Sequence, residues 1–319
     1  MKPTRVLAAT ALSCVLALGV AACGDDSPGG SDSGSSGSSL SGNIKIDGSS
    51  TVFPFAQAAA EQFKGKNSGV DISVGESGTG GGFEKFCAGE TDISDASRPI
   101  KEDEEAPVCK KNGVEYSAVQ IANDGIAIVT NKDLKIDCMT TAELKKLWNK
   151  DSKVSSFKDV NPAFPDQKVA LFGPGTDSGT FDFFTEEING EKGDTRKDYS
   201  PSEDDNVTVQ GVSGDKGGLG YFGFSYYEDN ADKLNLVKVD GGDGCVEPTA
   251  QTIQDGTYKP LGRPLFMYLS AKAIARPEVK GFMDYILDDQ QAVADASKIV
   301  AMTAAQSTKA KADLAAAES

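Results

Sequence analysis

The sequence contains no histidine, and this absence excludes several common kinds of active site. A Ser-His-Asp triad, a Cys-His pair and a histidine-ligated zinc all need that side chain. Positive charge is also scarce, because 32 Lys and Arg stand against 48 Asp and Glu and the formal net charge is −16. Such a chain is poorly suited to bind nucleic acid or an anionic membrane surface. With 319 residues, 39% of them hydrophobic, it can form one large or two medium globular domains.

The first 22 residues have the layout of an export signal. Lys2 and Arg5 precede an apolar stretch over residues 6–22. The run VAACG at residues 20–24 matches a bacterial lipobox, so we predict a lipoprotein signal peptide over residues 1–22 and lipidation of Cys23. An ordinary signal peptide or a single membrane anchor is the alternative, although a span of about 17 residues is short for crossing a bilayer.

A tether is expected between the lipid and the folded domain. Of the 19 residues from 24 to 42, 14 are Gly or Ser, which is the composition of a flexible linker with a span of roughly 25 Å. Removal of Lys2 and Arg5 with the signal peptide takes the net charge from −16 to −18. The prediction is an exported acidic protein, with the lipidated cysteine and tether over residues 23–42, anchored to the outer face of the cell membrane.

Four further cysteines are available for disulfides, which persist in exported proteins. They are Cys87, Cys109, Cys138 and Cys245. No pair has the C-x-x-C spacing of a redox or zinc motif, so we expect two disulfides, no metal and no cofactor. Of the three pairings, we favour Cys87–Cys109 and Cys138–Cys245, because each pair then stays within one half of the chain organisation given below.

Beyond the tether, short β-rich runs alternate with amphipathic stretches, as in an α/β fold. Strands are expected over Ile44–Asp47, Val70–Val74, Ala118–Ala122, Ile126–Thr130, Lys168–Phe172 and Asn235–Val239. Helices are expected over Phe55–Lys64, Phe83–Ala88, Thr141–Asn149, Phe181–Ile188 and from Pro277 to about Ala296, with a frayed helical tail over Lys309–Ser319.

Three strand-to-helix junctions are rich in Ser, Thr and Gly. They read DGSSTVFP at residues 47–54, ESGTGGGF at 76–83 and GPGTDSGTF at 173–181. Each opens a predicted helix, whose N-terminus offers unpaired N–H groups and the positive end of the helix dipole. Any one junction can be purely structural, since Ser and Thr are common N-caps and Gly is common in turns. Three together predict an enclosed anion site, and none has the lysine of a P-loop.

Four sequence blocks follow one another along the mature chain. They are GSSTVFP at 48–54, GTGGGF at 78–83, TDISDASRPI at 91–100 and GTDSGTFDFF at 175–184. In order and spacing they resemble the phosphate-binding proteins of the high-affinity phosphate ABC transporter. The resemblance implies an α/β, two-lobed periplasmic-binding-protein fold (type II-like), with the ligand in the inter-lobe cleft. We place the lobes at 43–130 plus 250–319 and at 131–249, and expect closure of a hinge of crossing strands near 122–130 and 240–258.

The resemblance also implies a set of phosphate contacts from both lobes. They are Ser50, Thr51, the backbone of Val52, Thr79, Gly80, Ser178, Gly179 and Thr180. The best-known pattern has a proton-accepting aspartate where Ser97 aligns and an arginine where Pro174 aligns. Arg98 is expected to replace that arginine through a bidentate contact with phosphate, beside the Ser97 hydroxyl. The alternative for Arg98 is a surface position or an ion pair with an acid such as Asp95.

The proton acceptor matters because phosphate keeps a proton at neutral pH and sulfate does not. Asp95 and Asp177 are the candidates, and Asp177 is equally well explained as a helix N-cap. The implied function is capture of inorganic phosphate by a monomer that is not an enzyme and that delivers the ion to membrane permease subunits. A same-fold protein for sulfate, molybdate or tungstate is the alternative. A secreted phosphatase is less favoured, because no Asp/Glu/His cluster has metal-ligand spacing.

Overall fold

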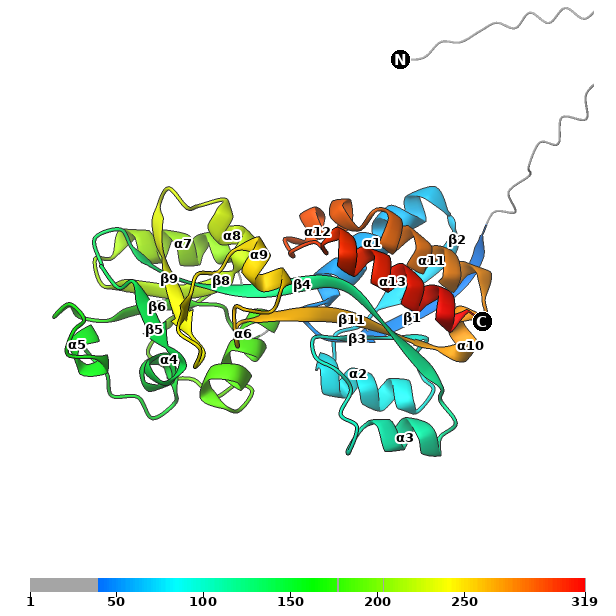
Figure 1. Ribbon diagram of the computed structural model, residues 1–319, viewed down its shortest axis with the longest axis horizontal. Helices are drawn as coiled ribbons and strands as arrows, with labels where there is room; N and C mark the ends of the chain where they lie inside the picture. Colours follow the sequence, from blue (N-terminus) through cyan, green and yellow to red (C-terminus); the bar gives the residue numbers. More distant parts are fainter. Residues whose placement is uncertain (1–39, 177, 203, 319) are drawn as a thin grey trace, which may run out of the picture. The chain divides into compact units, whose positions relative to one another are not determined.

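The computed structural model describes residues 40–176, 178–202 and 204–318, which form a mixed β-sheet covered by helices (Figure 1). The strands are β1 Ser41–Gly48, β2 Gly69–Val74, β3 Ile93–Ala96, β4 Tyr116–Asn131, β5 Cys138–Thr140, β6 Ala170–Gly173, β7 Ser200–Pro201, β8 Gly218–Gly223, β9 Leu234–Asp240, β10 Cys245–Val246 and β11 Gly262–Ser270. The helices are α1 Phe53–Lys66, α2 Gly78–Cys87, α3 Ala106–Lys111, α4 Thr141–Trp148, α5 Phe157–Val160, α6 Gly179–Phe184, α7 Asp205–Gly214, α8 Phe224–Glu228, α9 Ala250–Gln254, α10 Ala271–Ile274, α11 Pro277–Asp288, α12 Gln290–Ser297 and α13 Ala304–Ala317, with a π-helical turn, η1, over Thr185–Asn189.

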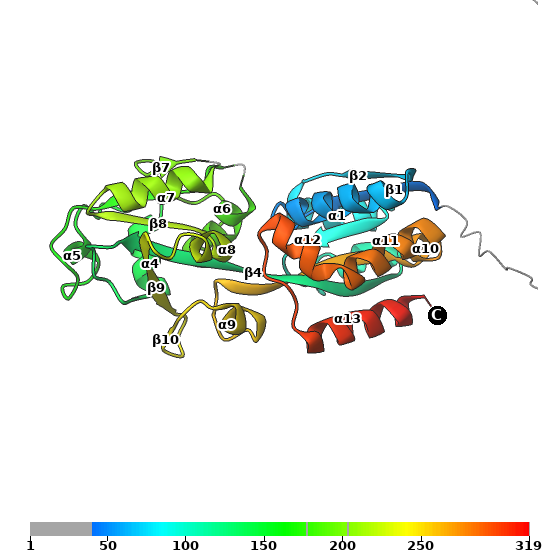
Figure 2. The same ribbon diagram turned by 90° about the horizontal axis from the view of Figure 1, so that it is seen from above.

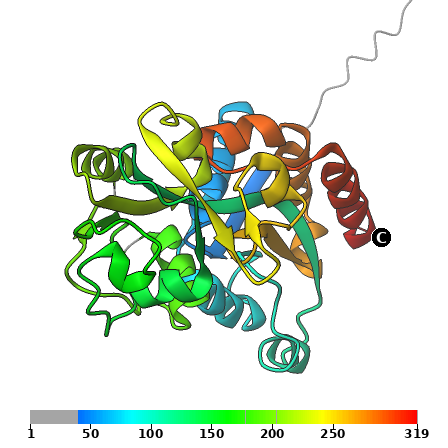
Figure 3. The same ribbon diagram turned by 60° about the vertical axis from the view of Figure 1, so that its left-hand side comes forward.

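Two lobes share the long strand β4. In the first lobe (residues 40–124 and 262–318) the strand order is β2-β1-β3-β11-β4, and β4 pairs with β11 as far as Gly125. In the second lobe (residues 125–261) the same strand continues from Ile126 and pairs with β8 and β9. Figure 3 shows β4 running from one lobe into the other. The two-lobed α/β architecture predicted from the sequence is confirmed.

Each lobe has its own hydrophobic core. In the first lobe α1, α11, α12 and α13 cover one face of the sheet, where Ile44, Phe282 and Leu314 share one cluster. Helices α2 and α3 cover the opposite face (Figure 1), and α13 lies along β4 (Figure 2). The second-lobe core is centred on Trp148, which makes an edge-to-face contact with Tyr221 at a centroid distance of 4.9 Å.

The lobe boundaries differ from those expected. Residues 126–129 lie in the second-lobe core together with Tyr258 and Leu261, whereas the sequence assigned 126–130 and 250–261 to the first lobe. The two strands expected on either side of Asn123 are one continuous strand. The sequence around Asn123 resembles a turn, but Asn123 exchanges two backbone hydrogen bonds with Val300, at 2.8 and 3.0 Å, and the strand continues.

Several elements differ from the sequence-based prediction. Strands β3, β8 and β11 were not expected, because they are short or contain Gly and Pro. The helix expected from Pro277 to about Ala296 is two helices, α11 and α12, which meet at Asp289. The expected frayed tail is the packed helix α13, whose Ala310 and Leu314 are buried.

Two disulfides are present, Cys87–Cys109 and Cys138–Cys245. They are the pairs favoured from the sequence, and they join α2 to α3 and β5 to β10. Among the described residues no helix combines the length and the apolar character that a bilayer span requires. The predicted signal peptide, Cys23 and most of the tether lie outside the described residues.

Candidate anion-binding site

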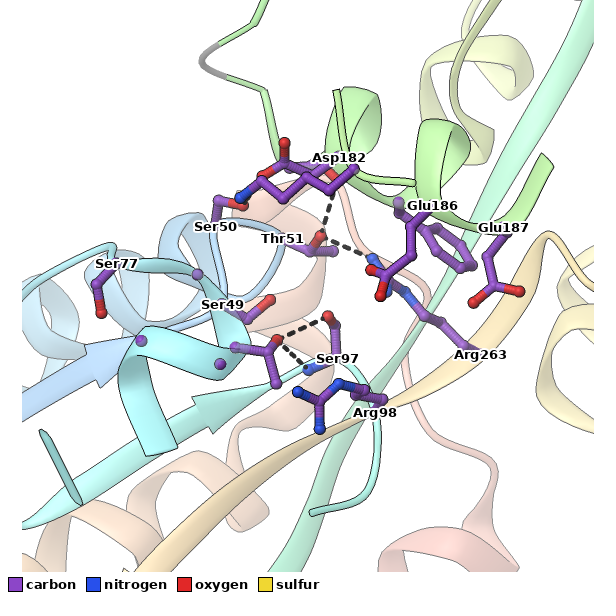
Figure 4. A pocket seen from close by; sticks show the side chains of 17 residues that line it. Ser49, Ser50, Thr51, Ser77, Ser97, Arg98, Asp182, Glu186, Glu187 and Arg263 are labelled. Carbon is purple, nitrogen blue, oxygen red and sulfur yellow. Dashed lines mark hydrogen bonds and ion pairs between the residues drawn. The ribbon is translucent and has the colours of Figure 1, made fainter. Parts of the chain in front are cut away.

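The three Ser/Thr/Gly junctions meet at one cavity of about 300 Å³ (Figure 4). Because β1 and β2 are parallel neighbours, α1 and α2 begin at the same edge of the sheet, and α6 reaches the cavity from the second lobe. The predicted convergence of the junctions is confirmed. The lining residues are Ser49, Ser50, Thr51, Ser77, Gly78, Thr79, Gly80, Gly81, Ser97, Arg98, Gly179, Asp182, Phe183, Glu186, Glu187, Lys192 and Arg263.

The start of α2 brings backbone donors to the cavity. This helix begins at Gly78, five residues before the expected start at Phe83, so Thr79 and Gly80 belong to its first turn. N–H groups in a first turn have no helical carbonyl to bond. Ser77 precedes the helix and is fixed by Asp47 Oδ1, which accepts from its backbone N–H at 3.0 Å and from its hydroxyl at 2.6 Å. The first turn of α2 can therefore present donors and a positive dipole end to an anion.

Seven of the ten predicted phosphate contacts line the cavity, namely Ser50, Thr51, Thr79, Gly80, Ser97, Arg98 and Gly179. Val52 does not, since it is buried and its N–H donates to the Ser49 carbonyl at 3.1 Å. Ser178 and Thr180 are also absent from the lining, and the Ser178 hydroxyl caps α6 by accepting from the Thr180 N–H at 3.2 Å. For these three residues the structure shows a local role. Asp177 lies outside the described residues.

Hydroxyl groups on the first lobe reach across to α6. Ser50 Oγ donates to Asp182 Oδ2 at 3.3 Å, and Thr51 Oγ1 donates to the Gly179 carbonyl at 3.3 Å. Within the first lobe, the hydroxyl oxygens of Thr79 and Ser97 lie 3.0 Å apart. The cavity is thus bordered by positioned hydroxyl groups from several elements, and the two lobes already touch at the start of α6.

The guanidinium of Arg98 is held by a neighbouring carboxylate. Its Nη1 and Nη2 donate to the two oxygens of Glu105 at 2.9 and 2.7 Å, and Nη1 also donates to the Pro99 carbonyl at 3.0 Å. The hydrogen bonds with Glu105 raise the pKa of Arg98. The expected alternative, an ion pair with an acid, is therefore observed, but the acid is Glu105 rather than Asp95. Arg98 lines the cavity with its bidentate face already occupied, and its contact with phosphate stays a prediction.

Sequence reasoning missed a second arginine at the cavity, Arg263. It stands near the start of β11, and its side chain is only 13% exposed. Its Nη2 donates to Thr51 Oγ1 at 2.9 Å, and its guanidinium carbon lies 3.3 Å from the centroid of the Phe183 ring. Burial lowers the pKa of Arg263 to about 10, which leaves it positively charged at neutral pH. Arg263 precedes Pro264 and lies far from the four sequence blocks, so no sequence motif indicated a role for it.

Three carboxylates of the second lobe also line the cavity, and none was predicted. Asp182 forms an ion pair with Lys192 at 2.7 Å, while Glu186 and Glu187 stand in the π-helical turn η1. Burial raises the pKa of Glu187; Arg263 opposes this shift and Glu186 adds to it. Within the ranges that the structure describes, no group of three or more Cys, Asp and Glu is placed to hold a metal ion. The cavity carries charges of both signs.

Asp95 is not placed to accept a proton from a ligand in the cavity. It is fully buried in β3 and is absent from the cavity lining, and neither of its carboxyl oxygens has a hydrogen-bond partner among the described residues. Burial, with a smaller contribution from Asp47, raises the pKa of Asp95 well above its usual 3.8. The position of Asp95 therefore does not support the predicted acceptor role.

This buried carboxyl should make stability depend on pH. A folded-state pKa above the unfolded value means that stability is complete below about pH 4 and is lost as the pH rises through the folded-state pKa. Asp95→Asn removes this loss, so we expect the variant to melt roughly 2–4 °C above the parent at pH 7, with little difference at pH 4.

Thermal unfolding at both pH values measures this effect. Asp103→Asn, at an exposed position, is the matched control and should melt like the parent at both pH values. Equal melting temperatures for Asp95→Asn and the parent at pH 7 would contradict the prediction.

Comparison with known proteins places the chain in a family. The model of the PBP superfamily domain matches residues 33–290. The phosphate-binding protein PstS of Staphylococcus saprophyticus is 42% identical over 307 residues, which cover 95% of this chain and 91% of that protein. A solved structure from Planctomyces limnophilus, described as a possible phosphate binding protein, has 45% identity and a TM-score of 0.83, and covers 88% of this chain and 100% of that one.

A second solved structure comes from Clostridium perfringens. It is named as a candidate substrate-binding protein of a phosphate ABC transporter and contains bound phosphate. Its identity is 27% and its TM-score 0.57, over 82% of this chain and 100% of that one. The residues matched by the family model include all three junctions and parts of both lobes. The chain therefore belongs to the PBP superfamily and, within it, to the family of the PstS phosphate-binding proteins.

Proposed function

We propose that this protein captures inorganic phosphate between its two lobes and delivers it to the membrane permease of an ABC transporter. The observation that carries the proposal is the convergence of three helix-opening Ser/Thr/Gly junctions, with two arginines, on one cavity. Relatives across most of the chain are named phosphate-binding proteins, and the Clostridium perfringens structure holds phosphate. Because those relatives are binding proteins, we infer that this protein is not an enzyme.

The proposed contacts are those predicted residues that line the cavity. They are the hydroxyl groups of Ser50, Thr51, Thr79 and Ser97, the backbone of Gly80 and Gly179, and the side chain of Arg98. Most belong to the first lobe, and Gly179 belongs to the second, so an anion held by all of them bridges the lobes. Binding should therefore favour a closed arrangement, with bending where β4 passes between the lobes at Gly125.

Calorimetric titration with phosphate, sulfate and molybdate tests the function. We expect one saturable phosphate site and weaker or no binding of the other two anions. Tighter binding of sulfate or molybdate would instead identify a same-fold protein for another oxyanion. Release of phosphate from a monoester substrate would contradict a pure binding role. Small-angle scattering on the same samples should show a smaller radius of gyration with phosphate, and an unchanged profile would argue against closure.

We infer from the first 42 residues that the protein is exported and lipid-anchored at the outer face of the cell membrane. The lipobox around Cys23 and the Gly/Ser-rich stretch after it support this inference. Mass spectrometry of the N-terminal peptide should find a diacylglycerol-modified Cys23, and Cys23→Ser should remain unprocessed and unlipidated. An unmodified cysteine in the mature protein would exclude the anchor. We further propose that the protein acts as a monomer, which size-exclusion chromatography with light scattering can test.

A further inference from the structure

Arg263 contacts both lobes and also β4, the strand that passes between them. The residue itself stands on β11, and it donates to Thr51 of the first lobe at 2.9 Å (Figure 4). Its guanidinium stacks on Phe183 of the second lobe at 3.3 Å, and its Nε lies 3.6 Å from the nearer carboxylate oxygen of Asp124 on β4. A change in the bonding of this one side chain can therefore affect the contact between the lobes and, at the same time, the strand β4 where it passes between them.

The guanidinium has donor capacity that its contacts within the protein do not fully use. Arg263 Nε and Asp124 Oδ2 are buried and form an ion pair with each other at 3.6 Å, and within the described residues neither atom has a closer hydrogen-bond partner. Buried polar groups in native proteins nearly always have hydrogen-bond partners. A buried polar atom without a close partner therefore indicates that one, such as a ligand, is missing. Burial raises the pKa of Asp124, and its ion pair with Arg263 opposes this shift. An anion in the adjoining cavity would supply both charge and acceptor oxygens.

The second arginine of the cavity is differently occupied. Both terminal nitrogens of Arg98 already bond the two oxygens of Glu105, so a bidentate contact with phosphate would have to break that pair. Glu186 and Glu187 line the cavity with Arg263, but neither is within ion-pair distance of it in the described part of the chain. Arg263 has only the longer, 3.6 Å ion pair with Asp124, so of the two guanidinium groups it is the less tightly held by a carboxylate and the more available to a ligand.

We propose that Arg263 is the principal cationic ligand of the bound anion and couples its binding to the hinge between the lobes. The inference rests on the proposed function, with phosphate as the ligand. Phosphate oxygens accept hydrogen bonds from the guanidinium and from Thr51, which Arg263 already contacts. Arg98, paired with Glu105, has a secondary role at the rim of the cavity.

Calorimetry with Arg263→Gln, Arg98→Gln and Arg276→Gln tests the assignment. We expect Arg263→Gln to weaken phosphate binding at least thirtyfold, as for the loss of one partner of a desolvated charge pair, and Arg98→Gln to have a smaller effect. Arg276 is the matched control, because it is also paired with a carboxylate, Asp92, but lies outside the cavity. Arg276→Gln should bind phosphate within twofold of the parent.

Two outcomes distinguish failure of the inference about Arg263 from failure of the proposed function. If the parent binds phosphate and folded Arg263→Gln binds it within threefold, the inference is wrong while the function stands. If the parent binds no phosphate, the proposed function itself fails.

A second measurement needs no folded variant. The sequence after the signal peptide contains four arginines, so their side-chain Nε–H signals can be resolved by NMR in the parent. Saturating phosphate should shift the Arg263 signal and leave that of Arg276 in place. An Arg263 signal that does not move would overturn the inference even if Arg263→Gln failed to fold.

Discussion

Replacing Gly179 by alanine is expected to weaken phosphate binding by about tenfold to hundredfold, through a clash worth about 1–3 kcal/mol. Gly179 is the first residue of α6 and packs against the loop before α1 on the other lobe. A Cβ at this position would overlap the backbone nitrogen of Thr51 and lie 2.6 Å from the carbonyl carbon of Ser50. Because both clashing atoms belong to the backbone, the clash can be relieved only if the lobes move apart.

Calorimetry and small-angle scattering together measure this effect. Gly179→Ala should bind phosphate weakly and keep a larger radius of gyration at phosphate saturation than the parent does. Gly65→Ala is the matched control, because Gly65 is also helical and a Cβ there would meet no atom within 4 Å. Parental affinity in Gly179→Ala would mean that binding does not need this close approach of the lobes.

Removing the Cys138–Cys245 disulfide is expected to cost about 4–5 kcal/mol of unfolding free energy. The two cysteines are 107 residues apart, and the chain-entropy model assigns about 4.7 kcal/mol to a loop of about 100 residues. The bond joins β5 to β10 in the second lobe, and neither cysteine lines the cavity. A double Ser variant should therefore lose stability, while the folded fraction keeps its phosphate affinity.

Denaturant titration of the two disulfide variants gives the comparison. The Cys87–Cys109 pair, with a separation of 22, should contribute about 3 kcal/mol in the same model, so its loss should be the smaller of the two. A cost below about 1 kcal/mol for the longer loop would show that the unfolded chain is already restricted without the bond. A large drop in the phosphate affinity of folded protein would indicate a role in the site.

The parts of the site that could be predicted are those encoded by neighbouring residues. The junctions at 47–54, 76–83 and 173–181 combine turn formers, helix starts and hydroxyl groups within eight or nine positions, so their local chemistry can be inferred from sequence alone. The first two meet because β1 and β2 are parallel neighbours that end at one edge of the sheet, and the third reaches the same cavity from the second lobe. The resemblance to phosphate-binding proteins indicated Ser50, Thr79 and Gly179, and all three line the cavity.

The residues that were missed depend on contacts between distant segments. Arg263 reaches Thr51 across 212 positions, from a strand whose Gly262 and Pro264 weaken the β signal. Glu186 and Glu187 resemble ordinary exposed residues of an amphipathic helix. Their place at the cavity depends on the π-helical turn that follows α6, which has no distinct sequence pattern here.

The continuity of β4 was missed for a related reason. Asn123, Asp124 and Gly125 favour a turn by composition, and local reasoning ended the strand there. Tertiary partners change the outcome, since Asn123 bonds Val300 through its backbone and Asp124 faces Arg263. All of these partners lie more than 130 positions further along the chain.

The first lobe is built from two separate stretches of the chain, and this sets the order in which the two lobes can be completed during synthesis. Ile44, near its beginning, and Leu314, near its end, belong to one hydrophobic cluster, and the whole second lobe is inserted between them. The second lobe, by contrast, is one unbroken stretch of chain. A polypeptide that emerges from its N-terminus can therefore complete the second lobe while the first still lacks its last helices. The first lobe is thus the last to be completed, because its hydrophobic cluster needs helices from the very end of the chain.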